Sequence, residues 1–357
     1  MPKVYFVGSG YMGCNYVRCL MPQLYGGYNG SVTSVFGKIK SREEVLMELP
    51  FSDIIVFHRP DTPETHMLAM ELKRLGKKVI FDNDDTASLD KGHPFYGIDE
   101  FGNKGNSENY KNIINNFILN ADHVTTTTDF LAEEYRKINK NVTVLPNCID
   151  PDDWGEPLYN ESDKVRILIS GSAAYTQDFE HVKDYLRELD ARDDVQLILF
   201  GLWGSEKRKE NPLVTKTYHR EYEFWDSLKN FEHVQWTTIG DYFETLRQLR
   251  VDLMLIPRKE IYFNRCKSNI KFLESAMLDI PCVAQTFTTK DSPYDGNIDG
   301  NNGLLAGDVN DWKEKVDALI LDKKLRREMG KKAHQFALEN FNIKNRYHLW
   351  DDLYKTL

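Results

Sequence analysis

Long hydrophobic runs are missing from this sequence. No more than four consecutive residues belong to the apolar set, whereas a membrane-spanning helix needs roughly twenty apolar residues and a signal peptide about seven to fifteen. We therefore expect neither a transmembrane segment nor a cleaved export signal.

Cysteine is scarce as well. The 357 residues include five cysteines, an odd number, and no two of them form a Cys-x-x-Cys pair. This pattern argues against a disulfide framework and against a structural zinc site. It is typical of a protein of the reducing cytosol, so we expect a cytoplasmic location.

An excess of positive charge is also lacking. Lys and Arg number 46 against 55 Asp and Glu, for a formal net charge of -9. Nothing global therefore attracts the chain to nucleic acid or to an anionic membrane. Hydrophobic residues make up 41% and charged residues 28%, which is typical of a globular protein, and the length predicts two domains.

Short β-rich runs alternate with helical patterns from one end of the chain to the other. This alternation predicts an α/β fold with parallel, doubly wound sheets. A linker rich in Pro, Asp and Gly spans 146–157 and divides the chain into two domains, 1–149 with 341–357, and 150–340. Strands are expected at 4–7, 32–36, 54–57, 79–81, 124–126, 142–145, 167–169, 195–200, 234–237, 253–256 and 282–284.

A glycine motif follows the first predicted strand. Gly8, Gly10 and Gly13 form G-x-G-x-x-G, which allows a tight turn and close approach of the backbone to a pyrophosphate. The next predicted strand ends without the acidic residue that holds an NAD ribose, while Lys38 and Lys40 leave NADP open. The motif is therefore either an NADP site or a turn lining the acceptor side of a cleft.

An acidic cluster, Asp82-Asn83-Asp84-Asp85, follows the predicted strand 79–81. Loops at this edge of a parallel sheet bind ligands, and Arg59 ends another strand at the same edge. The carboxylates could hold Mg²⁺ or Mn²⁺, cap the next helix, or accept hydrogen bonds from substrate hydroxyls. We favour the third interpretation, with His93 nearby.

A cationic loop follows the predicted strand 253–256. After it, Ser268 is a candidate N-cap of a helix, so the cations surround a helix N-terminus, which suits a diphosphate. Glu274 on that helix could bind a ribose diol, although a simple surface pair between Lys271 and Glu274 is the alternative. A second small-residue turn, Gly171-Ser172, is expected at the same sheet edge. The cations of the loop are Arg258, Arg265, Lys267 and Lys271.

The order of three segments resembles family-four glycosyltransferases of the GT-B fold: 268–285, 301–305 and 325–330. The stretch 142–150 resembles the end of the first domain in that family, and 341–357 resembles its last helix. The resemblance implies two Rossmann-like domains facing a central cleft, with the C-terminal helix crossing back onto the first domain.

The resemblance also implies an activity. It points to transfer of a sugar from a nucleoside-diphosphate sugar, most often a UDP-sugar, to an acceptor hydroxyl, with retention of configuration and without a required metal or cofactor. The acceptor could be a glycan, a lipid-linked sugar, a small molecule or a hydroxymethylated DNA base. Two alternatives remain: an NADP-dependent oxidoreductase, and a non-catalytic nucleotide-sugar-binding relative.

In the family, two glutamates eight positions apart frame the donor site. Glu274 matches the second, whereas Cys266 stands at the position of the first. We therefore expect Lys267 and Lys271, helped by Arg258 or Arg265, to take over the diphosphate. The expected catalytic residues are these two lysines and, on the acceptor side, Asp82 and Asp84. The remaining donor residues are Gly171, Ser172, Arg258, Arg265, Ser268, Asn269 and Glu274, and the acceptor residues are Gly8, Gly10, Gly13, Arg59, Asp85 and His93.

Overall fold

The computed structural model describes most of the chain. The described residues are 2–8, 12–32, 39–89, 96, 107–171, 177–201 and 224–357.

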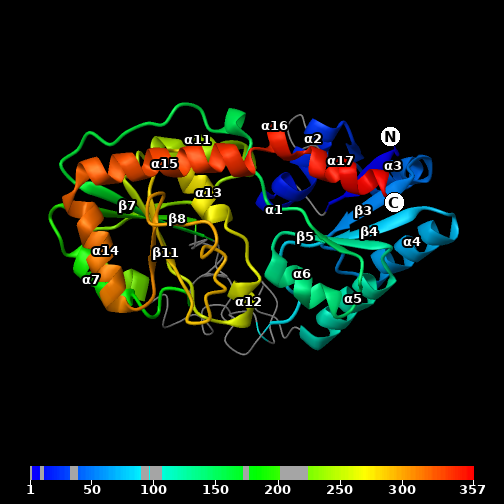
Figure 1. The fold of residues 1–357 in the computed structure, drawn as a ribbon, viewed down its shortest axis with the longest axis horizontal. Coiled ribbons are helices and arrows are strands. Elements are labelled where there is room, and N and C mark those ends of the chain that lie inside the picture. Colours follow the sequence, from blue (N-terminus) through cyan, green and yellow to red (C-terminus); the bar gives the residue numbers. More distant parts are fainter. Residues whose placement is uncertain are drawn as a thin grey trace.

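The first half of the chain forms a parallel six-stranded sheet (Figure 1). Its strand order is β2-β1-β3-β4-β5-β6, which extends the flavodoxin-like order. Successive strands are added toward one edge of the sheet up to β2 and toward the other edge from β3 on, so the switch point of this sheet lies between β1 and β3. The bounds are β1 Val4–Val7, β2 Asn29–Gly30, β3 Ile54–His58, β4 Lys78–Asp82, β5 His123–Thr126 and β6 Val142–Val144.

The second half forms another parallel six-stranded sheet, in the order β12-β11-β10-β7-β8-β9. This is the Rossmann order, and its direction reverses between β7 and β10. The bounds are β7 Val165–Gly171, β8 Val195–Gly201, β9 Glu232–Val234, β10 Leu253–Ile256, β11 Cys282–Gln285 and β12 Leu304–Ala306.

Helices connect the parallel strands. Those of the first half are α1 Gly13–Asn15, a π-helical turn Tyr16–Leu20, α2 Met21–Gly26, α3 Arg42–Glu48, a 3-10 turn Leu49–Phe51, α4 Pro63–Arg74, α5 Ser107–Asn120 and α6 Asp129–Arg136. Those that follow are a 3-10 turn Pro151–Asp153, α7 Lys183–Asp190, α11 Ile239–Gln248, α12 Tyr262–Arg265, α13 Ile270–Ala276, α14 Val309–Leu321, α15 Lys323–Phe341, α16 Ile343–Arg346 and α17 His348–Lys355.

The predicted α/β class and both doubly wound sheets are confirmed. The strand prediction at 32–36 falls mostly outside the described residues. The prediction at 234–237 needs correction, because β9 is Glu232–Val234 and shares only one residue with it. Two strands, β2 at Asn29–Gly30 and β12 at Leu304–Ala306, had no prediction. Short edge strands pair on one side only, so their sequences carry less of the continuous apolar signal of buried strands.

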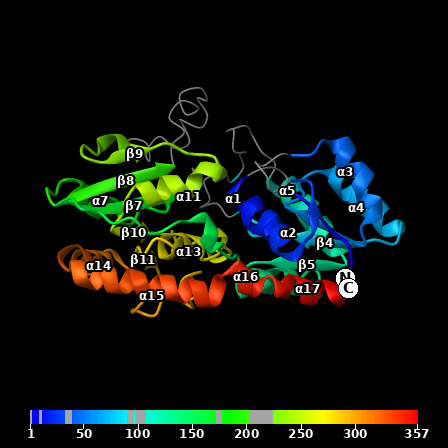
Figure 2. The same cartoon turned by 90° about the horizontal axis from the view of Figure 1, so that it is seen from above.

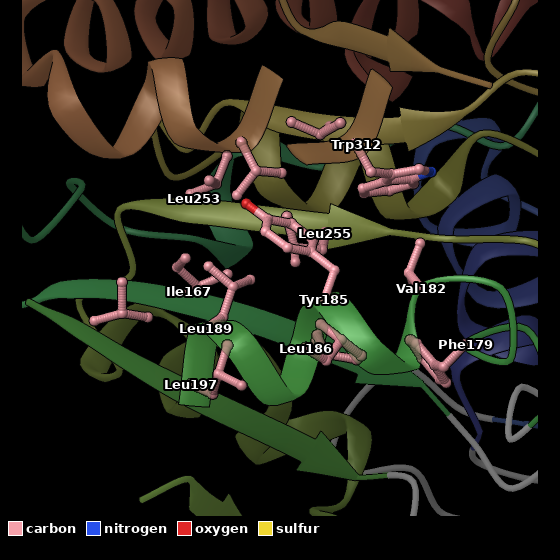
Figure 3. Packing of buried hydrophobic residues seen from close by; sticks show 14 of the residues in the cluster. Ile167, Phe179, Val182, Tyr185, Leu186, Leu189, Leu197, Leu253, Leu255 and Trp312 are labelled. Carbon is pink, nitrogen blue, oxygen red and sulfur yellow. The ribbon is translucent and has the colours of Figure 1, made fainter. Parts of the chain in front are cut away.

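Each sheet is buried because its strands are apolar on both faces. In the second sheet one face packs against α7 and α14, where Leu186, Leu189 and Trp312 meet strand residues such as Leu197 and Leu255 (Figure 3). The other face packs against α13 and α15 through a second cluster that includes Phe272, Met277 and Ala333. These two layers fix where the strands end and therefore where the loops that follow them lie.

The C-terminal helices connect the two halves of the chain. Figure 2 shows α15, α16 and α17 following one another along the length of the molecule, from the second sheet to the first. Trp350 and Tyr354 of α17 belong to the same core cluster as Phe6 of β1, and Tyr28 contacts Tyr354 edge to face. The predicted crossing of the last helix onto the first domain is confirmed.

None of the helices in the described ranges is both long enough and apolar enough for a membrane span.

Candidate functional site

The carboxyl ends of the strands beside each switch point carry the candidate residues. In parallel α/β sheets ligands bind where the strand order reverses. In the first sheet Gly8 follows β1 and Arg59 follows β3; in the second, Ser170 and Gly171 end β7, and the cationic loop follows β10. The sheet topology therefore places both predicted half-sites where ligands bind in this fold class.

Asp82 is the buried centre of the first half-site. His58 and Asp82 end neighbouring strands in register, and His58 Nδ1 lies 3.1 Å from Asp82 Oδ1. Arg18 donates from Nη2 and Nε at 2.6 and 3.1 Å, and the Thr125 hydroxyl donates at 2.6 Å. Burial alone would raise the pKa of Asp82, but Arg18 and His58 outweigh it and hold the pKa well below its usual value.

These contacts change what Asp82 can do. Its side chain is only 3% exposed, and both carboxylate oxygens bind protein groups. The sequence placed Asp82 among residues facing substrate, whereas the structure makes it the group that aligns Arg18, His58 and Thr125.

Arg59, Asp84 and Asp85 form the more exposed part of this half-site. Arg59 has a left-handed backbone (φ 49), which non-glycine residues adopt at a cost and which is frequent at functional sites. Its Nε donates to Asp84 Oδ1 at 2.7 Å, and its Nη2 donates to Asp85 Oδ2. Burial raises the pKa of Asp85, but Lys267 and Arg59 outweigh it and lower the pKa to about 2.

The carboxylates of the acidic cluster therefore bind the protein's own cations. Among the described residues, no group of three or more His, Cys, Asp or Glu side chains is arranged to hold a metal ion. A Mg²⁺ ion at Asp84 and Asp85 would have to displace Arg59 and Lys267 from them.

The second half-site is built around Lys271 and Glu274 on α13. Their side chains form an ion pair of 2.7 Å and are 12% and 13% exposed. Tyr242 of α11 donates its hydroxyl to Glu274 at 2.8 Å, and Lys271 donates to Tyr242 and to Ser170 at 3.1 and 3.2 Å. The alternative of a Lys271–Glu274 pair is thus half right, since the pair exists but is largely buried at the end of β7.

The protonation of Lys271 follows from these neighbours. Burial lowers its pKa, but the charge of Glu274 and the hydrogen bonds of Glu274 and Tyr242 outweigh burial and raise the pKa above its usual value. Lys271 is therefore a fixed positive charge at neutral pH.

The four cations of the loop are each paired with a carboxylate. Arg258 is buried against Asp178 at 3.1 Å, and Arg265 lies 3.0 Å from Glu260 and 3.4 Å from Asp291. The predicted ring of positive charge is therefore neutralised in this structure. Asp178 and Asp85 come from distant segments, whereas Glu260 and Glu274 lie within five positions of the cations they pair with.

The start of α13 differs from the sequence-based expectation. Asn269, not Ser268, is the N-cap, and it makes no side-chain capping bond. Ser268 instead accepts a hydrogen bond of 2.9 Å from Asn147. Cys266, at the position of the family's first glutamate, is buried in the core cluster of the first sheet.

A comparison with protein-family models decides the family. The model described as "Glycosyl transferase-like" matches residues 161–352, more than half of the 357 residues. The chain belongs to this glycosyl transferase-like family. It is therefore a glycosyltransferase, as its resemblance to the GT-B enzymes implied.

Solved structures with the same fold are GT-B glycosyltransferases. Anabaena Alr3699/HepE in complex with UDP-glucose superposes with a TM-score of 0.70 at 12% identity over 100% of both chains. Sucrose-phosphate synthase from Thermosynechococcus elongatus gives 0.65 at 14%, over 100% of this chain and 99% of that one. The galactosyltransferase WaaB gives 0.56 at 14%, over 99% and 100%. The comparison with curated proteins found no match.

Only part of the glycine motif of this glycosyltransferase lies within the described residues. Gly8 donates its N–H to the Ser31 hydroxyl at 2.9 Å, and a Cβ on Gly8 would lie 2.6 Å from Asn15 Oδ1. Gly13 begins α1 and faces open space. Gly10, His93 and Ser172 lie outside the described residues.

Gly171 ends β7 beside Gly201, which ends β8 in register with it. Gly201 has a positive φ of 86, and a Cβ there would lie 2.7 Å from the Gly171 carbonyl oxygen. The backbones at this end of the second sheet therefore approach more closely than side chains would permit.

Sequence reasoning missed three residues that contact the candidate site residues of this glycosyltransferase. Arg18 was overlooked although it stands within an otherwise apolar stretch, an arrangement that indicates a buried ion pair. Tyr242 and Asn147 carried no such signal, because their roles depend on contacts with Glu274 and Ser268 far along the chain.

Proposed function

We propose that this glycosyltransferase transfers a sugar from a nucleoside-diphosphate sugar, most simply a UDP-sugar, to an acceptor hydroxyl. The observation that carries the proposal is the buried Lys271–Glu274–Tyr242 cluster at the carboxyl end of β7. It lies at the switch point of the second sheet and within the segment matched by the family model. The titles of the HepE structures, which name UDP-glucose and UDP, support this donor class.

In this proposal the protein's cations stabilise the leaving group. Glycosyl transfer passes through a transition state with oxocarbenium character, and the departing diphosphate gains negative charge. Positive charges fixed before the reaction stabilise that charge without reorganisation. Lys271 and Lys267 supply them, with Arg258 and Arg265 more distant contributors, so the proposal assigns no step to a metal ion.

Glu274 has the chemistry to recognise the nucleotide ribose. A carboxylate accepts two hydroxyl donors readily, and Glu274 Oε2 is held in place by Lys271 and Tyr242. Because the oxygen is pre-aligned, little side-chain entropy is lost when a diol binds.

The acceptor half of the proposal uses the first sheet. Arg59, Asp84 and Asp85 line the end of β3 and β4, and Gly8 and Gly13 flank them across the switch point. We assign Asp84 and Asp85 to the acceptor hydroxyl and Asp82 to holding the cluster together. Retention of configuration belongs to the proposal on the strength of the family resemblance.

We also propose the domain boundaries expected from the sequence, 1–149 with 341–357 and 150–340. The isolated bridge between Ile149 and Asn342 supports them, because it joins the two points where the chain would cross between domains. The donor would then bind to 150–340 and the acceptor to 1–149.

A thermal-shift panel of UDP-, GDP-, ADP-, CMP- and dTDP-sugars with NADP tests the proposal. A ligand at one hundred times its dissociation constant stabilises by about 2.7 kcal/mol, which moves the midpoint by a few degrees in a protein of this size. We expect one nucleoside-diphosphate sugar to stabilise the wild type, and the shift to disappear in Glu274→Gln.

The matched control is Glu188→Gln, which removes a carboxylate from an exposed ion pair with Lys313 and should keep the full shift. Stabilisation by NADP alone would favour the oxidoreductase alternative instead. An unchanged shift in Glu274→Gln would remove Glu274 from the donor site.

A further inference from the structure

One ion pair joins the acceptor-side cluster directly to the donor-side loop. Lys267 Nζ lies 2.7 Å from Asp85 Oδ1, although the two residues are 182 positions apart. The side chains are 13% and 21% exposed, so the pair is more sheltered than an ordinary surface ion pair. The ammonium also lies 4.3 Å from the centre of the Phe263 ring.

The surrounding contacts hold the loop of Lys267 against the first sheet. α12 lies beside α6 in Figure 1, and the Tyr262 ring is 6.0 Å from that of Phe130. Cys266 is fully buried in the core cluster of the first sheet. On the other side of Lys267, Ser268 accepts the hydrogen bond from Asn147. The position of Lys267 is therefore set by a packed interface rather than by the ion pair alone.

We propose that Asp85 is a positioning residue that holds Lys267 at this interface until the donor binds, when Lys267 leaves Asp85 and binds the diphosphate. The inference rests on the proposed function, because it requires a nucleoside diphosphate at Lys267. The other oxygen of Asp85 remains bound to Arg59, so the carboxylate stays in place when the lysine turns away. Asp85 Oδ1 is then free to accept a hydrogen bond from an acceptor hydroxyl.

The ion pair between Lys267 and Asp85 predicts whether nucleotide affinity rises or falls when the charge of Asp85 is removed. A Lys ammonium is a compact point charge on a flexible stem, and here a carboxylate and a diphosphate compete for it. In the wild type, the free energy of nucleotide binding is reduced by the cost of separating Lys267 from Asp85. Removing the charge of Asp85 should therefore strengthen nucleotide binding, whereas loss of a merely structural residue would weaken it or leave it unchanged.

The test measures UDP binding by titration calorimetry in wild type, Asp85→Asn, Lys267→Ala and the double variant. We expect Asp85→Asn to bind UDP at least threefold more tightly than the wild type. The gain should vanish in the Lys267→Ala background, because the competition acts through that ammonium. Asp184→Asn, which removes the charge of an exposed pair with Arg187, should bind UDP as the wild type does.

Weaker or unchanged UDP binding in Asp85→Asn overturns the inference, and so does an equal gain in the presence and absence of Lys267. Asp85→Ser carries the same expectation and replaces Asp85→Asn if that variant does not fold. Glu274→Gln separates the two proposals: if it loses UDP binding while Asp85→Asn shows no gain, the donor site stands and only the role of Asp85 fails. If the thermal-shift panel selects another nucleoside diphosphate, that nucleotide replaces UDP in the titration, with the same expectations. If the wild type binds none of UDP, GDP, ADP and dTDP, the proposed function itself fails.

Discussion

At the scale of single residues, His58 links the candidate site to stability. Burial lowers its pKa, but the hydrogen bond to Asp82 and the nearby charges outweigh burial and raise the pKa from 6.5 to about 9. A group whose pKa is higher in the folded state stabilises the fold fully below its unfolded value. That stability is lost as the pH rises through the folded value, here between about 6.5 and 9.

We therefore expect the free energy of unfolding to fall across this range, by an amount on the order of 3 kcal/mol attributable to His58. Urea titrations at several pH values measure it. His58→Gln should be less stable at neutral pH but show a flatter profile, while His348→Gln, which changes an exposed histidine, should keep the wild-type profile. Parallel profiles for wild type and His58→Gln would show that His58 does not bind the proton.

At the scale of elements, α15 packs against the end of α13 at a glycine. A Cβ on Gly330 would lie 1.9 Å from the carbonyl oxygen of Asp279. Asp279 is itself fixed, with a positive φ of 56 and hydrogen bonds to Tyr159 and His334. The backbone there cannot yield, so the close approach of the two segments depends on the absence of a side chain.

Gly330→Ala should therefore destabilise the protein by about 1–3 kcal/mol through overpacking, although alanine is the better helix former by about 1 kcal/mol. Urea denaturation measures the change. Gly296→Ala is the control, since a Cβ there meets nothing within 4 Å and should have little effect. A more stable Gly330→Ala variant would mean that propensity outweighs the contact.

At the scale of the whole molecule, the C-terminal helices attach the end of the chain to the first sheet. Trp350 is 2% exposed and packs in the core cluster that includes Phe6 and Ile80. The Tyr28 hydroxyl donates to Asp351 on the same helix. The last helix thus completes one face of the first sheet, whose sequence lies more than two hundred residues earlier.

Trp350→Ala should cost about 3–5 kcal/mol and expose the segment after Phe341 to limited proteolysis. Trp236→Ala is the matched control, because Trp236 is 68% exposed and its loss should leave cleavage unchanged. Equal resistance to protease in wild type and Trp350→Ala would indicate that the helix stays attached without this side chain.

Local pattern determined much of this protein from the sequence alone. Apolar runs such as Val4–Val7 and Leu253–Ile256 predicted buried parallel strands because strands covered on both faces need continuous apolar residues. The spacing of Lys271 and Glu274 indicated their ion pair as the alternative to a ligand-binding role, since residues three apart are neighbours on a helix. The resemblance to GT-B enzymes followed from short sequence segments and from their order along the chain, both of which can be read without the structure.

The tertiary structure decided which charges meet. The sequence offered the cations of the loop after β10 as free charges, but Asp178, Glu260 and Asp85 neutralise Arg258, Arg265 and Lys267. It likewise decided that Asp82 is buried by Arg18 and that Cys266 packs into the core of the first sheet. Apart from Glu260 and Arg265, which are five positions apart, these contacts join residues dozens to hundreds of positions apart, and local periodicity carries no information about such pairs. Only the packing of the two sheets against their helices brings those side chains within reach.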